Sequence, residues 1–439
     1  MGTDKKDKFG LWSIVLLGIN GIIGTGIFLL PNRAYALMGP SSLLILLFDA
    51  FLAGCLALCF AEVAGFFSRN GGPYLYAKAA FGDFVGYEVG VLKLVVTIIA
   101  WAAMAVGFAT ALGAAFPFFA GDTMKNLIAA VLIGGLTIMN IAGVKISKIL
   151  NNIMTISKLV PLCVFIAVGL FFVNGSNFTP FVPTHMADGA FANAAITMFF
   201  AYTGFEAIAV AAEDFKDPKK DLPRGIILTM IIVTIIIIYM LVVGISIGIL
   251  GPDLAVDKAP IQTAFGRAVG PVGAYFILIG TLFSMGGINL AESFIAPRAC
   301  TSLAEDGMLP AFLNRRTSWG TPWASSVVVA ILSILLAWSG SFTTLAAISA
   351  VSRFTQYLPT VLSVIVFRRK WKDRERTYKI PGGIFVPVVA FLTSLWMLSN
   401  AKPMQLVWGL GGILVIAPYY LVYKKKKAEG LVKDHDEEA

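Results

Sequence analysis

The sequence predicts an all-α membrane protein built from twelve membrane-spanning helices. Of its 439 residues, 58% are hydrophobic and 13% are charged, whereas soluble domains carry about 25% charged residues. Apolar runs long enough to cross a bilayer, which takes about 20 residues, recur along the whole chain. We expect the twelve spans at 11–38, 41–67, 86–116, 125–142, 151–173, 189–212, 225–249, 271–297, 324–339, 343–366, 384–400 and 405–423.

Lysine and arginine are distributed unequally between the loops on the two sides of the membrane. If the amino terminus lies inside and the number of spans is even, the inner loops hold most of the 34 Lys and Arg residues. This bias predicts a multi-pass protein of the plasma (inner) membrane with two cytoplasmic tails, at 1–10 and 424–439. The net charge of +9 then reflects topology and contact with anionic lipid, so we expect no nucleic-acid partner.

The first span contains a glycine-rich stretch, residues 18–28, in the middle of its apolar run. Four of these residues are glycine, including Gly24 and Gly26 on either side of Thr25, and each glycine costs a helix about 1 kcal/mol relative to alanine. Glycines either let helices pack closely or mark an unwound segment beside a cavity. The density of glycines and the presence of Thr25 favour an unwound segment, which in transporters marks the substrate site.

The second to fifth spans carry isolated charges. We expect Glu62 at the inner interface, near the end of the second span, and a short interfacial or re-entrant helix in the apolar inner loop 70–82. Lys158 lies in the fifth span, where its ammonium group either reaches back to the inner surface or faces the interior. An interior Lys158 would act as a fixed cation in place of a coupling ion, bonded to carbonyl groups of the first span, or would release its proton.

The sixth span repeats the signal of the first. Thr203 and Gly204 interrupt the middle of its apolar run, and Glu206 follows at a depth where a carboxylate is costly. Two interrupted helices five spans apart run in opposite directions, as an inverted repeat of five helices predicts. The expected units are a first repeat at 11–173, a second, inverted repeat at 189–366, and two additional helices at 384–423.

Together the two interruptions fit the two charged ends of an α-amino acid. The half-helix that starts near Thr25 presents free N–H groups and a positive dipole end to a carboxylate, with Thr25 and Gly26 as donors. The interruption of the sixth span leaves carbonyl groups near Phe200 and Thr203, which suit an ammonium group. We therefore expect the substrate between the two interruptions.

Glu206 and the aromatic residues beside it each have two interpretations. Glu206 is either a structural partner in a polar cluster or a proton carrier that couples the gates. Phe200 is either a lid over the site or an ordinary core residue, and Tyr202 is expected mainly in the core.

Further polar candidates lie in later spans. Arg353, in the tenth span, either pairs with an inner-facing carboxylate or reaches the substrate, and Ser284 and Asn289 in the eighth span are candidates for the wall of the site. Both histidines lie outside the spans, and the four cysteines lie in or next to apolar runs. We therefore expect no metal site, no disulfide framework and no cofactor.

Five motifs follow one another along the chain: Gly24-Thr-Gly-Ile-Phe28, Gly71-Gly-Pro-Tyr74 with Phe81-Gly82, Tyr202-Thr-Gly-Phe-Glu206, Asp217-Pro-Lys-Lys-Asp-Leu-Pro-Arg224 and Ala304-Glu-Asp-Gly-Met-Leu-Pro310. In this order they resemble the motifs of the amino acid–polyamine–organocation superfamily of transporters. Within the superfamily, the chain is most similar to bacterial relatives of the L-type amino acid transporters.

The resemblance implies a LeuT-like fold, with two inverted five-helix repeats plus two helices, and with helices 1 and 6 unwound at mid-membrane. It implies main-chain amides for the substrate carboxylate and main-chain carbonyls for its amino group, at Ile23, Gly24, Thr25, Gly26, Phe200, Thr203 and Gly204. Phe200 matches an aromatic inner gate, and Glu206 matches a carboxylate linked to proton or gating roles. Lys158 matches a lysine that stands where related transporters bind sodium.

The sequence is thus interpreted as that of a sodium-independent transporter of small or neutral L-amino acids. It would work by alternating access, as an exchanger or a proton symporter, without an obligate protein partner. The alternatives are a membrane amino acid sensor without transport activity and a transporter of cationic amino acids or amines. An intramembrane enzyme would need a catalytic constellation inside the spans, and the sequence offers none.

Overall fold

The computed structural model describes residues 10–68, 71–143, 148–233 and 236–429. Within these ranges the chain forms helices and turns and no β-strand, so the predicted all-α class is confirmed. Nine helical segments of the described residues are long and apolar enough to cross a membrane. Three shorter apolar helices accompany them, at 190–202, 323–339 and 385–399. The expected tails fall mostly outside the described residues.

The α-helices follow one another along almost the whole chain. They are α1 (Leu11–Ile22), α2 (Thr25–Leu29), α3 (Pro31–Met38), α4 (Ser42–Ala64), α5 (Pro73–Phe81), α6 (Asp83–Ala115), α7 (Asp122–Ile141), α8 (Lys148–Gly169), α9 (Ala190–Phe199), α10 (Pro218–Val233), α11 (Ile236–Leu250), α12 (Pro260–Val269), α13 (Pro271–Glu305), α14 (Trp323–Ser339), α15 (Phe342–Lys370), α16 (Phe385–Ser399), α17 (Pro403–Leu410) and α18 (Gly412–Ala428). Short 3-10 helices connect them, namely η1 (Gly39–Ser41), η2 (Pro117–Phe119), η3 (Leu170–Phe172), η4 (Gly175–Phe178), η5 (Phe200–Tyr202), η6 (Phe205–Asp214), η7 (Gly251–Ala255) and η8 (Ala311–Asn314).

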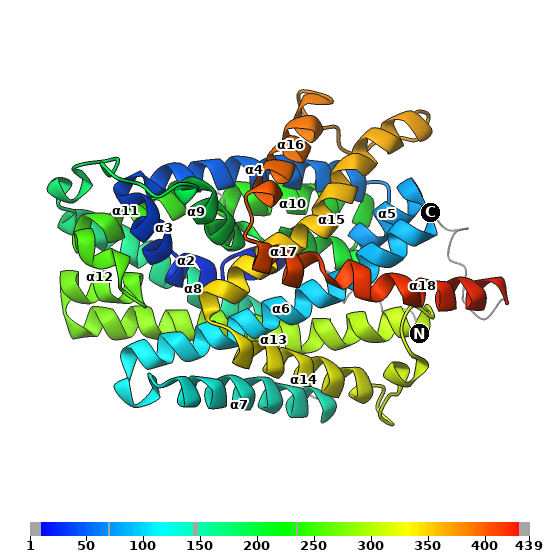
Figure 1. Ribbon diagram of the computed structural model, residues 1–439, viewed down its shortest axis with the longest axis horizontal. Coiled ribbons are helices and arrows are strands. Elements are labelled where there is room, and N and C mark those ends of the chain that lie inside the picture. Colours follow the sequence, from blue (N-terminus) through cyan, green and yellow to red (C-terminus); the bar gives the residue numbers. More distant parts are fainter. Residues whose placement is uncertain (1–9, 69–70, 144–147, 234–235, 430–439) are drawn as a thin grey trace.

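Most of the long helices run along the long axis of the molecule (Figure 1). The central one is α6, which packs against α13 and α15 and buries Trp101 completely. α7 and α14 lie side by side along one edge of the bundle (Figure 1). The first helix, α1, packs between α8 and α10, so segments far apart in the sequence surround it.

The first expected span, 11–38, consists of three helices. Pro31 opens α3 rather than ending the helical path, because Leu30 keeps right-handed helical angles (φ −93°, ψ −16°) and a proline is tolerated at the first helical position. The helix expected within 70–82 is present as α5. Helix α12 was not expected from the sequence, although Pro260 at its start and Gly270 (φ +82°) after its end are typical helix boundaries.

The last span was expected to end at residue 423, whereas α18 continues to Ala428. The lysines in its final turn lie at the carboxyl end of the helix, where cations are favourable. Lys427 also reaches Asp83 of α6, with 2.7 Å between Nζ and Oδ2. Both the position of the lysines and the Lys427–Asp83 ion pair favour a helix that extends into the charged segment.

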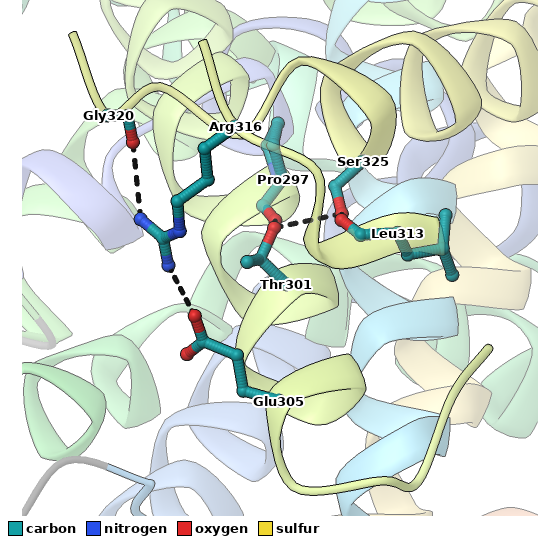
Figure 2. A network of polar contacts seen from close by, with 7 residues as sticks. All are labelled: Pro297, Thr301, Glu305, Leu313, Arg316, Gly320 and Ser325. Carbon is teal, nitrogen blue, oxygen red and sulfur yellow. Dashed lines mark hydrogen bonds and ion pairs between the residues drawn. The ribbon is translucent and has the colours of Figure 1, made fainter. Parts of the chain in front are cut away.

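The segment after α13 is held by two small polar clusters (Figure 2). The Arg316 guanidinium donates to Glu305 Oε1 at 2.7 Å and to the Gly320 carbonyl at 3.2 Å. In the second cluster, the Ser325 hydroxyl donates to the Leu313 carbonyl at 2.6 Å and lies 2.9 Å from the Thr301 hydroxyl. The clusters fix the loop that contains the Ala304–Pro310 motif against the start of α14.

Candidate functional site

The first helical path is interrupted inside the glycine-rich stretch. α1 ends at Ile22, and Ile23 (φ −72°, ψ 98°) and Gly24 (φ −135°, ψ −151°) are extended before α2 begins at Thr25. No side chain caps the amino end of α2. The interruption therefore exposes main-chain carbonyls on its α1 side and main-chain amides on its α2 side.

A second interruption follows α9. The helix tightens into η5, Thr203 is extended (φ −84°, ψ 158°), and Gly204 has a φ of +115° before η6 begins. Only glycine adopts that φ readily, so Gly204 is required by the backbone itself. The Thr203 hydroxyl donates to the Phe200 carbonyl at 2.8 Å, and this bond closes the turn.

The two interruptions are in direct contact. A methyl group at Gly26 would lie 2.6 Å from the Cα atom of Ala201, and one at Gly204 would collide with the Gly21 carbonyl oxygen. The surrounding side chains are buried, with Thr25 0% and Phe200 3% exposed. Glycine therefore lets the two segments meet backbone to backbone in the interior, as an arrangement with a shared site requires.

Lys158 of α8 forms hydrogen bonds with the main chain of the first interruption. Its Nζ donates to the carbonyl oxygens of Asn20 (3.0 Å) and Ile23 (2.7 Å), and its side chain is 0% exposed. The ammonium group is thus in the interior and does not reach the inner surface. Ser284 of α13 donates to the same Ile23 carbonyl at 3.4 Å. This is the geometry expected of a fixed internal cation; its role in transport stays a prediction.

Three other predicted site residues differ in whether their contacts cross between helices. The Thr25 hydroxyl donates to the Met104 sulfur at 3.0 Å, and Asn289 donates to the Met285 carbonyl of its own helix at 2.8 Å. Phe200 packs edge to face against Phe342, with 6.0 Å between ring centroids. Thr25 and Phe200 therefore belong to the contact region of the two interruptions, whereas the Asn289 amide nitrogen is used within α13.

Tyr202 is a core residue, yet its hydroxyl has a specific partner. It donates to the Leu46 carbonyl of α4 at 3.0 Å, and the ring packs against Tyr239 of α11, with 5.1 Å between centroids. The Tyr239 hydroxyl donates to the Ala201 carbonyl at 3.0 Å. These two tyrosines connect the second interruption to α4 and α11.

Glu206 is the centre of a buried polar cluster. Its carboxylate forms an ion pair with Arg353 of α15, and it accepts hydrogen bonds from the Gly204 amide (2.9 Å) and the Tyr357 hydroxyl (3.1 Å). The side chains of Glu206 and Arg353 are 4% and 11% exposed. Of the two interpretations of Arg353, the structure shows the pairing with a carboxylate. Tyr357 was missed, although its spacing of four residues from Arg353 places both on one helix face.

The side chains around Gly24 and Thr25 come from three other helices. A methyl group at Gly24 would lie 2.6 Å from Ile288 of α13 and 3.3 Å from Met104 of α6. Phe342 of α15 lies close to Gly107, which itself faces Thr25. These side chains are apolar, and no pattern in the sequence distinguishes them from other core residues. Within the described residues, no group of three or more His, Cys, Asp or Glu side chains could hold a metal ion.

Comparison with known proteins gives relatives that match most of the chain. The family model for amino acid permeases matches residues 9–413. An uncharacterized transporter of Mycobacterium tuberculosis is 33% identical over 389 residues, covering 82% of this chain and 80% of the relative. The branched-chain amino acid permease BcaP of Bacillus subtilis is 29% identical, covering 97% of this chain and 94% of the relative. The serine/threonine exchanger SteT of the same organism is 26% identical, covering 96% and 98%.

Proposed function

Because the chain belongs to the amino acid permease family, we propose that it is a sodium-independent transporter of small or neutral L-amino acids. It carries its substrate between the two interruptions by alternating access, as an exchanger or a proton symporter. The contact between Lys158 and the first interruption supports this proposal best. Its ammonium group donates to the carbonyl oxygens of Asn20 and Ile23, which are main-chain oxygens of the kind that coordinate sodium at interrupted helices.

The proposal includes the topology expected from the sequence. Nine long and three shorter apolar helices of the described residues would form twelve spans in a plasma membrane, with both termini in the cytoplasm. α1–α2 and α9–η6 would be the first helices of two inverted five-helix repeats at 11–173 and 189–366, with the last two spans, at 384–423, outside the repeats. Both interruptions would then lie near mid-membrane.

The proposed substrate site uses main-chain groups for the charged ends of the amino acid. The amides of Gly24, Thr25 and Gly26 start a helix that no side chain caps, so they suit a carboxylate. The proposed partners of the ammonium group are the carbonyls of Phe200 and Ile23 and the Thr203–Gly204 turn. In this closed arrangement the Phe200 carbonyl accepts from the Thr203 hydroxyl, and the Ile23 carbonyl accepts from Lys158 and Ser284, so these bonds have to be shared or released when the substrate binds.

The preference for a neutral substrate is supported by the side chains beside Gly24 and Thr25. Met104, Ile288 and Phe342 are apolar and offer no partner for a charged side chain. Two relatives are named for neutral substrates, as a branched-chain permease and a serine/threonine exchanger. Glu206, paired with Arg353 and Tyr357, would hold the second interruption in its closed position and release it when the gate moves.

Transport by the purified full-length protein in proteoliposomes tests the proposal. We expect a labelled mixture of the twenty L-amino acids to enter the vesicles, with the same rate in sodium and potassium buffers. Competition by each unlabelled amino acid then identifies the preferred substrate, and comparison of vesicles with and without internal amino acid separates exchange from symport. If no amino acid enters under any of these conditions, the chain is not a transporter of amino acids.

A further inference from the structure

We propose that Asp49 is a proton-binding site of this protein, and that its protonation is linked to the movement of the second interruption, residues 203–204. The inference rests on the proposed transport function and adds to it the ion that accompanies the substrate. It concerns a residue of α4 that contributes to neither interruption.

Asp49 is completely enclosed. Its side chain is 0% exposed, and neither carboxylate oxygen has a hydrogen-bond partner in the described part of the chain. An ionised carboxylate is strongly disfavoured in such a place, because it has lost water and gained no donor or cation in exchange. The environment therefore stabilises the neutral, protonated carboxyl group in this closed arrangement.

Two other buried carboxylates of this fold have the hydrogen-bond and ion-pair partners expected of a structural role. Glu62 receives two hydrogen bonds from Arg368 and one from the Ile380 amide. Glu206 pairs with Arg353 and accepts two further hydrogen bonds. Asp49 has no comparable set of partners, so a structural role does not account for a carboxylate at this position.

The helices around Asp49 bring few groups that could titrate with it. Asp49 lies seven residues after Ser42, about 10 Å along the axis from the start of α4. Of the elements packed on α4, α9 and α16 contain no charged residue, η5 contributes Tyr202, and α11 contributes Tyr239. In α3, Arg33 is exposed.

The remaining charges belong to the other end of α4. Phe60 of α4 packs against Tyr357, which bonds Glu206, so the Glu206–Arg353 pair lies about three turns beyond Asp49. At the carboxyl end of α4, Arg368 bonds Glu62 and Gly65 faces Pro223. The charges in the first turns of α10 lie at that end, and they are Lys219, Lys220, Asp221 and Arg224. Of these groups, Tyr202 reaches the face of α4 that carries Asp49, because its hydroxyl bonds the Leu46 carbonyl.

Tyr202 also connects Asp49 to the second interruption. Its hydroxyl bonds the Leu46 carbonyl, and Leu46 and Asp49, three residues apart, share one face of α4. Tyr202 is the residue directly before Thr203, and its ring packs on Tyr239, which bonds Ala201. A movement of the second interruption therefore has to move Tyr202 along the face of α4 that carries Asp49.

This geometry gives a proton cycle. With the second interruption closed, Asp49 is dry and holds a proton as the neutral acid. When Tyr202 moves away, water reaches the carboxyl group, and the proton passes to that water and leaves the carboxylate behind. In the proposed topology α4 starts on the outer side, so Asp49 lies in the outer half of the span, where an external proton can recharge it.

The test compares net uptake with counterflow in proteoliposomes that contain the full-length protein. The probe is the labelled mixture of the twenty L-amino acids, with the outside buffer either equal to the inside or more acidic. For the natural protein we expect the acidic outside buffer to raise net uptake at least fivefold. Asparagine imitates the protonated acid, so Asp49→Asn should lose this stimulation while counterflow at equal pH stays within about twofold. Asp49→Glu, which can titrate, should keep the stimulation.

Glu88→Gln is the matched control. Glu88 of α6 is also buried, and both its carboxylate oxygens lack a partner among the described residues, but Glu88 lies near the start of α6 beside Tyr87. It should keep the stimulation by acid. If Asp49→Asn does not yield folded protein, Asp49→Ser takes its place. Proton movement by the natural protein is then also followed directly, with a dye that reports the internal pH during uptake.

The outcomes separate the two proposals. If the natural protein shows counterflow but no proton movement, or if the asparagine variant keeps the stimulation, Asp49 is not the proton site, although the transport function stands. Loss of stimulation in Glu88→Gln would also overturn the assignment to Asp49. If the natural protein shows no counterflow at all, the transport function itself fails.

Discussion

At the scale of single residues, Lys158 has the contacts that best explain a buried charge. Its ammonium group is buried away from water and donates hydrogen bonds to two main-chain carbonyls. Among the described residues, no carboxylate lies within hydrogen-bond distance of it. These carbonyls belong to a helix end that has lost its own hydrogen bonds, so the lysine and the interruption satisfy one another. Removal of the side chain takes this charged donor away from both buried oxygens.

We expect Lys158→Ala to slow amino acid uptake at least tenfold. The loss of a hydrogen bond to a buried polar group costs about 1–3 kcal/mol, and the alanine variant removes the Lys158 donor from two buried carbonyls. Initial rates of uptake in proteoliposomes, in sodium and in potassium buffer, provide the measurement, and sodium should not restore the rate. Lys125→Ala, at an exposed ion pair with Asp122, is the control. Natural rates in Lys158→Ala would show that the buried ammonium group is dispensable.

At the scale of elements, glycine determines how closely the two interruptions approach. Gly26 faces the backbone of Ala201, and backbone atoms cannot move aside as the end of a flexible side chain can. The close contact at this point therefore requires a residue without a Cβ atom at position 26.

Gly26→Ala should reduce uptake at least tenfold without loss of the folded protein. The added methyl group would lie 2.6 Å from the Ala201 Cα atom, so α2 and η5 have to separate. Gly134→Ala is the matched control, because Gly134 of α7 has no atom within 4 Å of the added methyl group. Uptake and elution from a size-exclusion column check both variants. Equal uptake in the two variants would contradict the close contact.

A second relation between elements ties the end of α4 to α15. The Glu62 side chain is 1% exposed, and its carboxylate accepts hydrogen bonds from two nitrogen atoms of Arg368, at 2.6 and 2.7 Å. It also accepts from the Ile380 amide at 2.8 Å, so one carboxylate holds α4, α15 and the segment after α15 together. The structure places Glu62 in this clamp near the end of α4, and its expected position at the inner interface stays a prediction.

Glu62→Gln should therefore lower the thermal stability of the protein in detergent. Breaking a buried ion pair by removing one charge costs about 3–5 kcal/mol, because the partner stays buried without compensation. Glu305→Gln provides a control, since the Glu305–Arg316 pair (Figure 2) has both side chains more than 40% exposed and such pairs contribute little. The temperature at which monodisperse protein is lost should fall by several degrees for Glu62→Gln only. Equal temperatures would refute the clamp.

At the scale of the whole molecule, the apolar helices surround a small number of buried charges. Lys158 and the Glu206–Arg353 pair lie beside the two interruptions, whereas the Glu62–Arg368 pair joins the carboxyl end of α4 to α15. The outer surface of the bundle instead carries large apolar side chains, for example Phe171, Val272 and Leu414. This distribution is typical of a protein whose surface contacts lipid and whose polar groups serve an internal pathway.

Labelling of single cysteines checks the proposed topology. In a variant without the four natural cysteines, Ser176→Cys should react with a membrane-impermeant maleimide added to intact cells. Lys425→Cys should react only after the membrane is opened, because the basic carboxyl end is expected inside. Both positions are exposed, so access to the reagent depends on the side of the membrane. Reaction of Lys425→Cys in intact cells would show that the orientation is reversed.

The sequence by itself determined the helical class, the approximate ends of most helices and the two places where glycine weakens a helix. These properties depend on local composition, because hydropathy and helix propensity act over one or two turns. It did not determine that Glu206 pairs with Arg353, that Glu62 pairs with Arg368, 306 positions away, or that Asp49 has no hydrogen-bond partner among the described residues. Only the tertiary structure decided these points. Pairing between distant helices depends on how the helices cross. The electrostatic energy of a charged side chain depends on which groups that crossing brings within a few ångströms of it.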